Sequence, residues 1–198
     1  MDRRSRKGEQ QYHLSKEERK ERDADIKTWI NVNPTTNEQL VDMAFFDSVM
    51  TATKYTARER NEGRIRAVAT VTEFVNKRRY PKWLFCTGWW VKPQQGWHEK
   101  KGTDFTLLYW PYCVCVRGPK VNKEILPDIE FSIPESEFFA YVEIDCGSEG
   151  KREFQARCEH YIKINDPVLF VVACGGKARK NDEARLEEIK GWASAIYK

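Results

Sequence analysis

A strand–helix–strand pattern in the last third of the chain limits the fold more than any other feature of the sequence. Residues 138–144 form a short run rich in aromatic and β-branched side chains, residues 151–164 follow as a helical pattern, and residues 168–173 form a second apolar run. A helix that joins two strands in this order is a crossover, so the two strands are expected to be parallel neighbours. The second half of the protein is therefore predicted to be an α/β structure.

The rest of the second half also has the sequence pattern of an α/β structure. Short β-rich runs separated by Pro and Gly predict further strands at 105–110, 112–117 and 129–133, and a last helix is expected at 182–196. Together these elements predict an α/β domain with a mixed sheet over residues 104–198. The segment before it, residues 93–103, is rich in Gly, Gln and Lys. It is predicted to be either the tip of a β-hairpin wing or a linker between the two halves of the chain.

The first half begins with helix signals. Ser15 is placed to cap a helix that runs to about residue 31, and Glu18 stands at the third helical position, which is the capping-box pattern. Thr36 is placed to cap a second helix after the Asn33-Pro34 break. These signals predict two short helices that are separated by a turn.

Further helical and β-rich segments follow in the first half. A third helical segment carries several arginines, and the apolar spacing between residues 65 and 75 predicts a fourth helix. Two β-rich runs, 82–87 and 89–92, come after a basic turn. This order predicts a winged helix-turn-helix domain over residues 14–98, preceded by a disordered basic arm at residues 1–13.

Composition excludes several classes of protein. Hydrophobic residues make up 40% and aromatic residues 13% of the 198 residues, which excludes a chain that is disordered over most of its length. The apolar runs have strand length, far below the roughly 18 residues of a membrane-spanning helix, and the basic start lacks the apolar segment of a secretion signal. We therefore expect a cytoplasmic protein with no membrane contact. Its six cysteines are expected to be reduced, and Cys113 and Cys115 are interpreted as buried thiols rather than zinc ligands.

Acidic residues gather at the expected ends of two neighbouring strands. Glu143 and Asp145 lie two residues apart, so both side chains face the same side of the sheet. Asp128 stands at the start of a strand that can pair with theirs as a hairpin, which brings a third carboxylate beside them. Converging carboxylates repel one another unless a cation such as Mg²⁺ neutralises them, and Mg²⁺ polarises a phosphodiester and orients a water nucleophile. Each acid taken singly also fits a turn or a solvated strand end.

These residues resemble the motif of the PD-(D/E)XK nuclease superfamily, and more narrowly the C-terminal part of the plasmid replication-relaxation proteins. The resemblance rests on Pro127-Asp128, Glu143-Ile144-Asp145, Gly147 and a helix that carries Arg157 and Tyr161. It implies a winged-helix DNA-binding domain followed by a nuclease-like core, with Asp128 and Glu143 as ligands of Mg²⁺. It also implies work on the DNA of a mobile element, in plasmid or phage replication, relaxation or mobilisation, with replication or relaxosome proteins as partners.

One position departs from the pattern of active nucleases. Their motif has a lysine two residues after the acidic residue, where it holds the attacking water and stabilises developing negative charge, and this chain has Asp145 there. Lys151, Arg152 or Arg157 of the following helix can supply the missing charge. We expect a core that binds DNA more than it cuts it. The alternative is an Mg²⁺-dependent DNA endonuclease with an atypical Glu-x-Asp motif, whose catalytic residues are Asp128, Glu143, Asp145, Lys151 and Arg157.

Basic residues concentrate in the first half of the chain, although the net charge of the whole chain is only +4. They favour contact with double-stranded DNA because the arginines lie where a recognition helix and a basic turn are expected. A solvated helix face has the same composition. The candidate DNA-binding residues are Lys54, Tyr55, Arg58, Arg60, Arg64, Arg66, Lys77, Arg78 and Arg79.

Two hypotheses without catalysis stay open beside the endonuclease. One is a transcriptional or assembly factor that binds its DNA site as a homodimer. The other is a protein–protein adaptor, which would show no salt-sensitive affinity for DNA.

Overall fold

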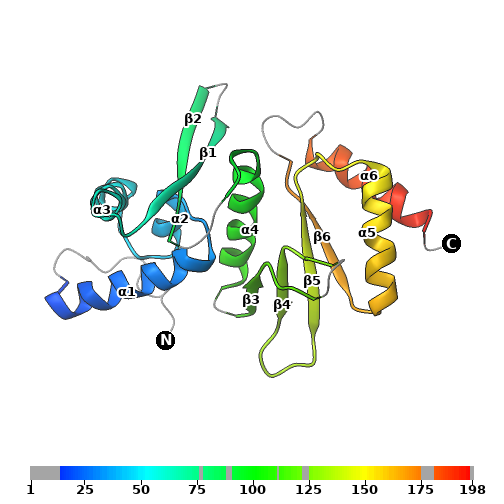
Figure 1. Ribbon diagram of the computed structural model, residues 1–198, viewed down its shortest axis with the longest axis horizontal. Coiled ribbons are helices and arrows are strands. Elements are labelled where there is room, and N and C mark those ends of the chain that lie inside the picture. The colour runs from blue at the N-terminus through cyan, green and yellow to red at the C-terminus, as the bar shows by residue number, and fades with distance from the viewer. Residues whose placement is uncertain are drawn as a thin grey trace. The chain divides into compact units, whose positions relative to one another are not determined.

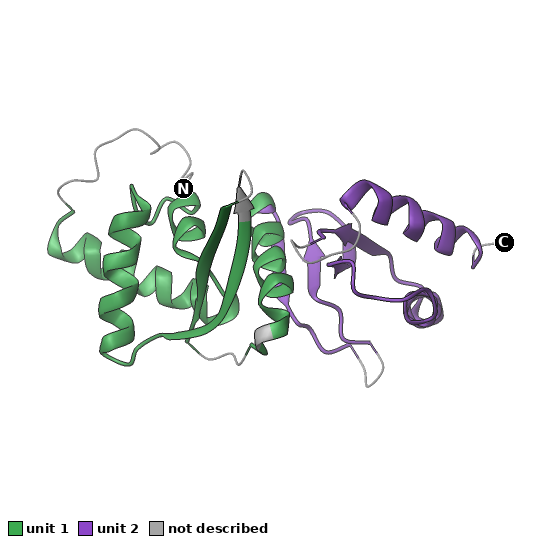
Figure 2. Cartoon of the chain, turned by 90° about the horizontal axis from the view of Figure 1, so that it is seen from above, with its two compact units in different colours: residues 1–108 green, residues 109–198 purple. Residues whose placement is uncertain are grey.

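The computed structural model describes residues 14–75, 78–87, 91–110, 112–121, 125–174 and 181–196 of a mixed α+β protein (Figure 1). The chain divides into two compact units, Met1–Leu108 (unit 1) and Tyr109–Lys198 (unit 2) (Figure 2). The expected disordered arm, residues 1–13, lies outside the described residues. None of the helices in the described part of the chain has both the length and the apolar character that crossing a membrane requires.

Unit 1 starts with the helices α1 (Lys16–Val32), α2 (Asn37–Asp42) and α3 (Val49–Asn61). Ser15 and Glu18 form a capping box at the start of α1, and Thr36 caps α2 in the same way, as the sequence predicts. Ser48 accepts a hydrogen bond from a backbone N–H of the first turn of α3. These caps satisfy backbone N–H groups that have no partner inside the helix.

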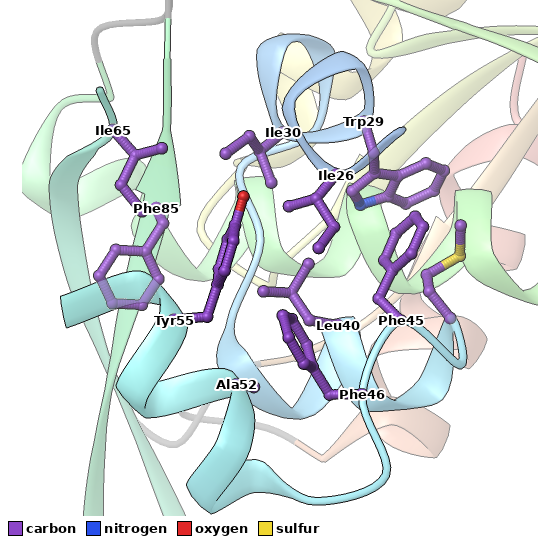
Figure 3. Close-up of a cluster of buried hydrophobic side chains, with 11 residues drawn as sticks. Ile26, Trp29, Ile30, Leu40, Phe45, Phe46, Ala52, Tyr55, Ile65 and Phe85 are labelled. Carbon is purple, nitrogen blue, oxygen red and sulfur yellow. The ribbon is translucent and has the colours of Figure 1, made fainter. Parts of the chain in front are cut away.

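The core of unit 1 lies where α1, α2 and α3 meet (Figure 3). Burying each large apolar side chain contributes about 1.5–3 kcal/mol to folding, so this cluster is the main force that holds the helices together. The Trp29 indole N–H donates a hydrogen bond to the Thr35 hydroxyl at 3.0 Å, which satisfies the polar edge of that ring. The buried members of the cluster are Ile26, Trp29, Ile30, Leu40, Met43, Phe45, Phe46, Ala52, Tyr55, Ile65 and Phe85.

A long hairpin follows the helices. Strand β1 (Arg66–Val75) pairs antiparallel with β2 (Arg78–Cys86). The helix predicted between residues 65 and 75 is therefore wrong. Ala69 and Val71 lie two residues apart on one side of β1 and are buried with Leu84 of β2, which is the period of a strand rather than of a helix.

The segment between α1 and α2 adds to this hairpin. Thr35 pairs with Phe85 of β2 as an isolated antiparallel bridge, through two backbone hydrogen bonds of 3.0 and 2.9 Å. The order of elements is therefore helix, bridge segment, helix, helix and hairpin.

After β2 comes a second difference from the sequence expectation. A short 3-10 helix, η3 (Pro93–Gln95), leads into α4 (Gly96–Tyr109), so the strand predicted at 105–110 is wrong and most of segment 93–103 is helical. Contacts distant in sequence fix this helix: the Gln39 side chain donates to the Asp104 carboxylate at 2.7 Å, and the Thr103 hydroxyl donates to the Pro34 carbonyl at 2.8 Å. The strand expected at 89–92 falls partly outside the described residues, and its last two residues are not in a strand.

Unit 2 contains a mixed sheet in the order β3-β4-β5-β6. The strands β3 (Val114–Arg117), β4 (Ile129–Ser132) and β5 (Phe139–Asp145) are antiparallel neighbours, and β6 (Val168–Val172) is parallel to β5. Helix α5 (Lys151–Ile164) connects β5 to β6, which confirms the predicted crossover, and α6 (Asp182–Ser194) follows.

Helices α5 and α6 pack on one face of this sheet. Phe154 and Cys158 of α5 are buried with Ile189 of α6, and Phe170 of β6 packs against them. Tyr161 of α5 packs against Tyr141 of β5 in a neighbouring cluster. The two helices therefore lie against the face on which Glu143 and Asp145 project, because these residues alternate with Val142 and Ile144 along β5.

Candidate functional site

Two acidic side chains of β5, Glu143 and Asp145, lie on the same face of the sheet, and both are buried. They bind different helices. Glu143 accepts hydrogen bonds from α5, whereas Asp145 accepts them from α6. The carboxyl end of β5 is therefore the place where both helices are held to the sheet by charged contacts.

Asp128 lies directly before β4 and contacts the same end of β5. Its Oδ2 atom accepts a hydrogen bond from the backbone N–H of Ile144 at 2.7 Å. The register of β4 with β5 explains this placement, because Ile129 stands opposite Val142 and the chain entering β4 therefore passes Glu143 and Ile144. The structure thus brings Asp128 beside Glu143.

Burial and neighbouring charges set the ionisation of Glu143. Burial, followed by the negative charge of Asp128, raises the pKa of Glu143 to about 7, although Arg157 and a hydrogen bond from Tyr161 favour the ionised form. The same burial, with the Glu143 charge, raises the pKa of Tyr161 above its ordinary value. The Tyr161 hydroxyl therefore stays protonated and donates its hydrogen bond to Glu143.

Arg157 bridges two carboxylates. Its Nη1 atom donates to Glu143 Oε2 at 2.7 Å, and its Nη2 atom lies 2.7 Å from Glu149 Oε1. The attraction of these carboxylates outweighs burial and raises the pKa of Arg157, so the guanidinium is permanently charged. Lys151 is exposed on the first residue of α5. Of these two candidate cations, Arg157 is the one that contacts the buried acid.

Asp145 is neutralised by a residue that the sequence did not indicate. Arg185 of α6 donates to its Oδ2 atom from Nε at 3.0 Å and from Nη2 at 2.6 Å. Arg185 also donates to the backbone carbonyl of Glu149 at 2.8 Å and lies over the ring of Trp192, 4.7 Å from its centre. The other oxygen of Asp145 accepts the N–H of Gly147. Both oxygens of this carboxylate are thus occupied by groups of the protein.

These contacts decide how well the acids suit the Mg²⁺ that the resemblance implies. Asp128 and Glu143 are oxygen ligands of the kind Mg²⁺ prefers. A cation there competes with Arg157 for Glu143, and Asp145 is held by Arg185. In the described ranges no three His, Cys, Asp or Glu side chains are grouped so as to hold a metal ion. Asp128 and Glu143 stay as the two candidate ligands, and the ion pair with Arg185 sets Asp145 apart from them.

The cysteines do not pair with one another. All six are free thiols, and Cys113 and Cys115 are half-buried rather than fully buried. Burial raises the pKa of Cys115 to about 11, which keeps its thiol protonated at neutral pH.

In unit 1 the candidate DNA-binding residues fall into two groups. One group is exposed: Lys54 and Arg60 on α3, Arg66 at the start of β1, and Arg78 and Arg79 at the start of β2. The others make contacts within the protein, although the side chains of Arg58 and Arg64 are also 53% and 43% exposed. Tyr55 is buried in the core with Phe46, as Figure 3 shows. Lys77 lies outside the described residues.

A buried glutamate, Glu59 of α3, binds the remaining two arginines. Arg58 donates to Glu59 Oε1 at 3.0 Å, and Arg64 donates to both Glu59 oxygens at 2.6 and 2.7 Å. These hydrogen bonds outweigh burial and hold the pKa of Glu59 at about 2. Arg58 also lies 3.5 Å from Asp23 of α1. The pair of arginines thus helps to fix α3, and only part of their charge is offered to solvent.

Sequence reasoning missed Arg185, Glu149 and Glu59. Arg185 and Glu59 lie in charged helical stretches that look like ordinary surface helices, and their burial depends on packing between elements distant in the chain. One signal was present for Glu59: it is the one acid within α3, and it is flanked by Arg58 and Arg60.

We compared the chain with family models, curated proteins and solved structures, and none of them matches.

Proposed function

We propose that the protein binds double-stranded DNA through unit 1, and that unit 2 is a nuclease-like core that serves binding more than cutting. The proposal includes the setting that the sequence resemblance implies, which is the replication, relaxation or mobilisation of a plasmid or phage.

The order of elements in unit 1 supports a winged helix. The observation that carries this part is the pairing of Thr35 with Phe85, which places the segment between α1 and α2 at the edge of the β1–β2 hairpin. A winged helix-turn-helix has this succession of helices and a hairpin, and its recognition helix enters the major groove. In unit 1 that helix is α3 and the hairpin is the wing.

Charge on this surface suits a polyanion. Exposed cations lie on α3 at Lys54 and Arg60 and on the hairpin at Arg66 and Arg78. Each cation that replaces a condensed counterion on DNA adds affinity that falls as the salt concentration rises.

The topology of unit 2 supports the nuclease-like core. Antiparallel β3, β4 and β5 are followed by α5 and the parallel β6. Asp128 lies directly before β4 and Glu143 lies on β5, in the order that the resemblance implies. The identity of residue 145 is the reason to propose that unit 2 binds DNA rather than cuts it. Where an active nuclease needs a lysine, this chain has a carboxylate whose charge is already compensated by Arg185.

The alternative, an Mg²⁺-dependent endonuclease, is favoured by the position of Arg157 beside Asp128 and Glu143. In that case Asp128 and Glu143 would hold the cation, which when bound polarises the phosphodiester and activates a water molecule. Arg157 would then leave Glu143 and stay on Glu149, within reach of the negative charge that develops on the phosphate.

One experiment separates these functions. Supercoiled and branched DNA is incubated with the full chain and with Asp128→Asn and Glu143→Gln variants, in EDTA, Mg²⁺ or Mn²⁺. The proposal predicts retarded but intact DNA in every lane. Nicking that requires the metal and is lost in both variants would establish the endonuclease instead, and an absence of retardation at low salt would refute DNA binding.

A further inference from the structure

The exposed face of α3 carries a stripe of four residues, of which the charge argument uses only Lys54. Met50, Lys54, Ala57 and Asn61 follow one another at spacings of four, three and four, which aligns them along one side of the helix. The opposite side, with Ala52, Tyr55, Thr56 and Glu59, is buried. The stripe therefore points away from the core of unit 1.

Met50 is the unusual member of the stripe. Its side chain is 67% exposed, and the neighbouring Val49 is 41% exposed. A large flexible apolar side chain at the start of an exposed helix gains nothing from water and is suited to an apolar contact in a partner.

The exposed side of α3 carries no acidic side chain. The one acid of α3 is the buried Glu59, so the exposed side of this helix carries cations and neutral groups only. Both flanking arginines are exposed, but Arg58 is also bound to Glu59 and Asp23. An anionic groove is therefore the complementary surface for this helix.

The chemistry of the stripe matches base edges in the major groove of DNA. A lysine recognises the two acceptors of guanine, an asparagine recognises adenine, and apolar side chains contact the methyl group of thymine. A recognition helix lies in the major groove, where its exposed side faces the base edges. Phosphate contacts, in contrast, position a protein on DNA without reading its sequence.

We infer that the Met50–Lys54–Ala57–Asn61 stripe reads the sequence of duplex DNA in the major groove, while Arg60 and the hairpin cations hold the phosphates. This inference rests on the proposed function and adds that binding is sequence-specific. Met50 and Ala57 contact thymine methyl groups, Lys54 contacts guanine and Asn61 contacts adenine. Arg58 and Arg64 fix the helix instead of reading bases.

The test is selection from a library of duplex DNA with a randomised centre, using the full chain, followed by affinity measurements on the selected duplex and on a scrambled duplex of equal length. The variants are Met50→Ala and Asn61→Ala, which leave the net charge unchanged, and Arg60→Ala. Lys190→Ala, on the exposed surface of α6, is the matched control.

The wild type should enrich a motif that contains thymine, guanine and adenine. Met50→Ala and Asn61→Ala should each lower the ratio of specific to scrambled affinity by about fivefold or more, with the scrambled affinity unchanged. Arg60→Ala should weaken both duplexes equally, and Lys190→Ala should weaken neither. Each variant must keep the melting temperature of the wild type, which is expected because the substituted side chains are exposed.

Two results would overturn the inference while leaving DNA binding intact: a wild type that binds DNA but enriches no motif, or stripe variants that keep the full specificity ratio. A wild type that binds neither duplex at low salt would overturn the proposed function and this inference together.

Discussion

Arg185 of α6 donates two hydrogen bonds to a single carboxylate oxygen of Asp145 at the end of β5, and the two side chains are only 4% and 2% exposed. This pair crosses 40 residues of sequence and joins the last helix to the centre of the sheet. Asp145 stands at the position where the nuclease motif that the sequence resembles has a lysine. The contact is therefore both a structural anchor and the main reason to expect binding without cutting.

Replacing Arg185 should destabilise unit 2 strongly. Arg185→Met leaves the Asp145 carboxylate buried without its cation, which costs about 3–5 kcal/mol of unfolding free energy. The double variant Asp145→Asn/Arg185→Met removes the orphaned charge and should recover most of this loss. Urea unfolding followed by circular dichroism measures both values, and equal stabilities for the single and double variants would contradict a buried ion pair.

Removing the hydroxyl of Tyr161 should weaken the fold by a smaller amount. Tyr161→Phe leaves one oxygen of buried Glu143 without its hydrogen-bond donor, which costs about 1–3 kcal/mol. The matched control is Tyr112→Phe in the same unit, because the Tyr112 side chain is 64% exposed. Thermal unfolding should show a lower melting temperature for the first variant and no change for the second. Equal melting temperatures would mean that the hydroxyl contributes nothing.

Unit 1 should lose stability in acid through Glu59. Because the pKa of Glu59 falls to about 2 in the folded chain, its contribution is present above the ordinary glutamate pKa of 4.5 and disappears as the pH falls toward 2. The contribution amounts to about 2–3 kcal/mol at neutral pH. Glu59→Gln should be less stable than the wild type by this amount at pH 7, and the difference should shrink steadily below pH 4.5. A difference that stays constant over that range would show that ionisation of Glu59 is not involved.

The sequence predicted best those features that depend on neighbouring residues. Ser15, Glu18 and Thr36 cap helices because the donors they satisfy lie three residues away, and no distant contact is needed. The β5–α5–β6 crossover was predictable for a related reason, since a single helix between two strands leaves one common arrangement.

The errors arose where distant partners decide the local structure. The apolar spacing of Ile65, Val68, Ala69 and Thr72 fits a helix, but β2 offers a strand on which Ala69 and Val71 are buried, and the chain pairs with it. Residues 105–110 are rich in apolar and aromatic side chains and looked like a strand, but contacts from Gln39 and Pro34 hold that region as α4.

The candidate site also has a part that the sequence could predict and a part that it could not. The meeting of Asp128 and Glu143 follows from a hairpin and the period of a strand, both of which are visible in the sequence. The cations that neutralise the acids come from separate helices. Arg157 was one of several basic residues in its helix, and Arg185 lies 40 residues from its partner in a helix that gave no sign of facing the sheet.

The salt dependence of binding tests most directly whether Arg60 of α3 and the cations of the hairpin bind the DNA backbone. The affinity of the full chain for a duplex is measured at rising KCl concentration, with the wild type and with Arg60→Ala, Arg66→Ala and Arg78→Ala. Each phosphate contact contributes about 0.9 to the slope of log affinity against log salt. We expect a clear negative slope for the wild type and a loss of about 0.9 from that slope for each substitution. A slope near zero, or a slope that none of the three substitutions changes, would contradict binding of the DNA backbone by these cations.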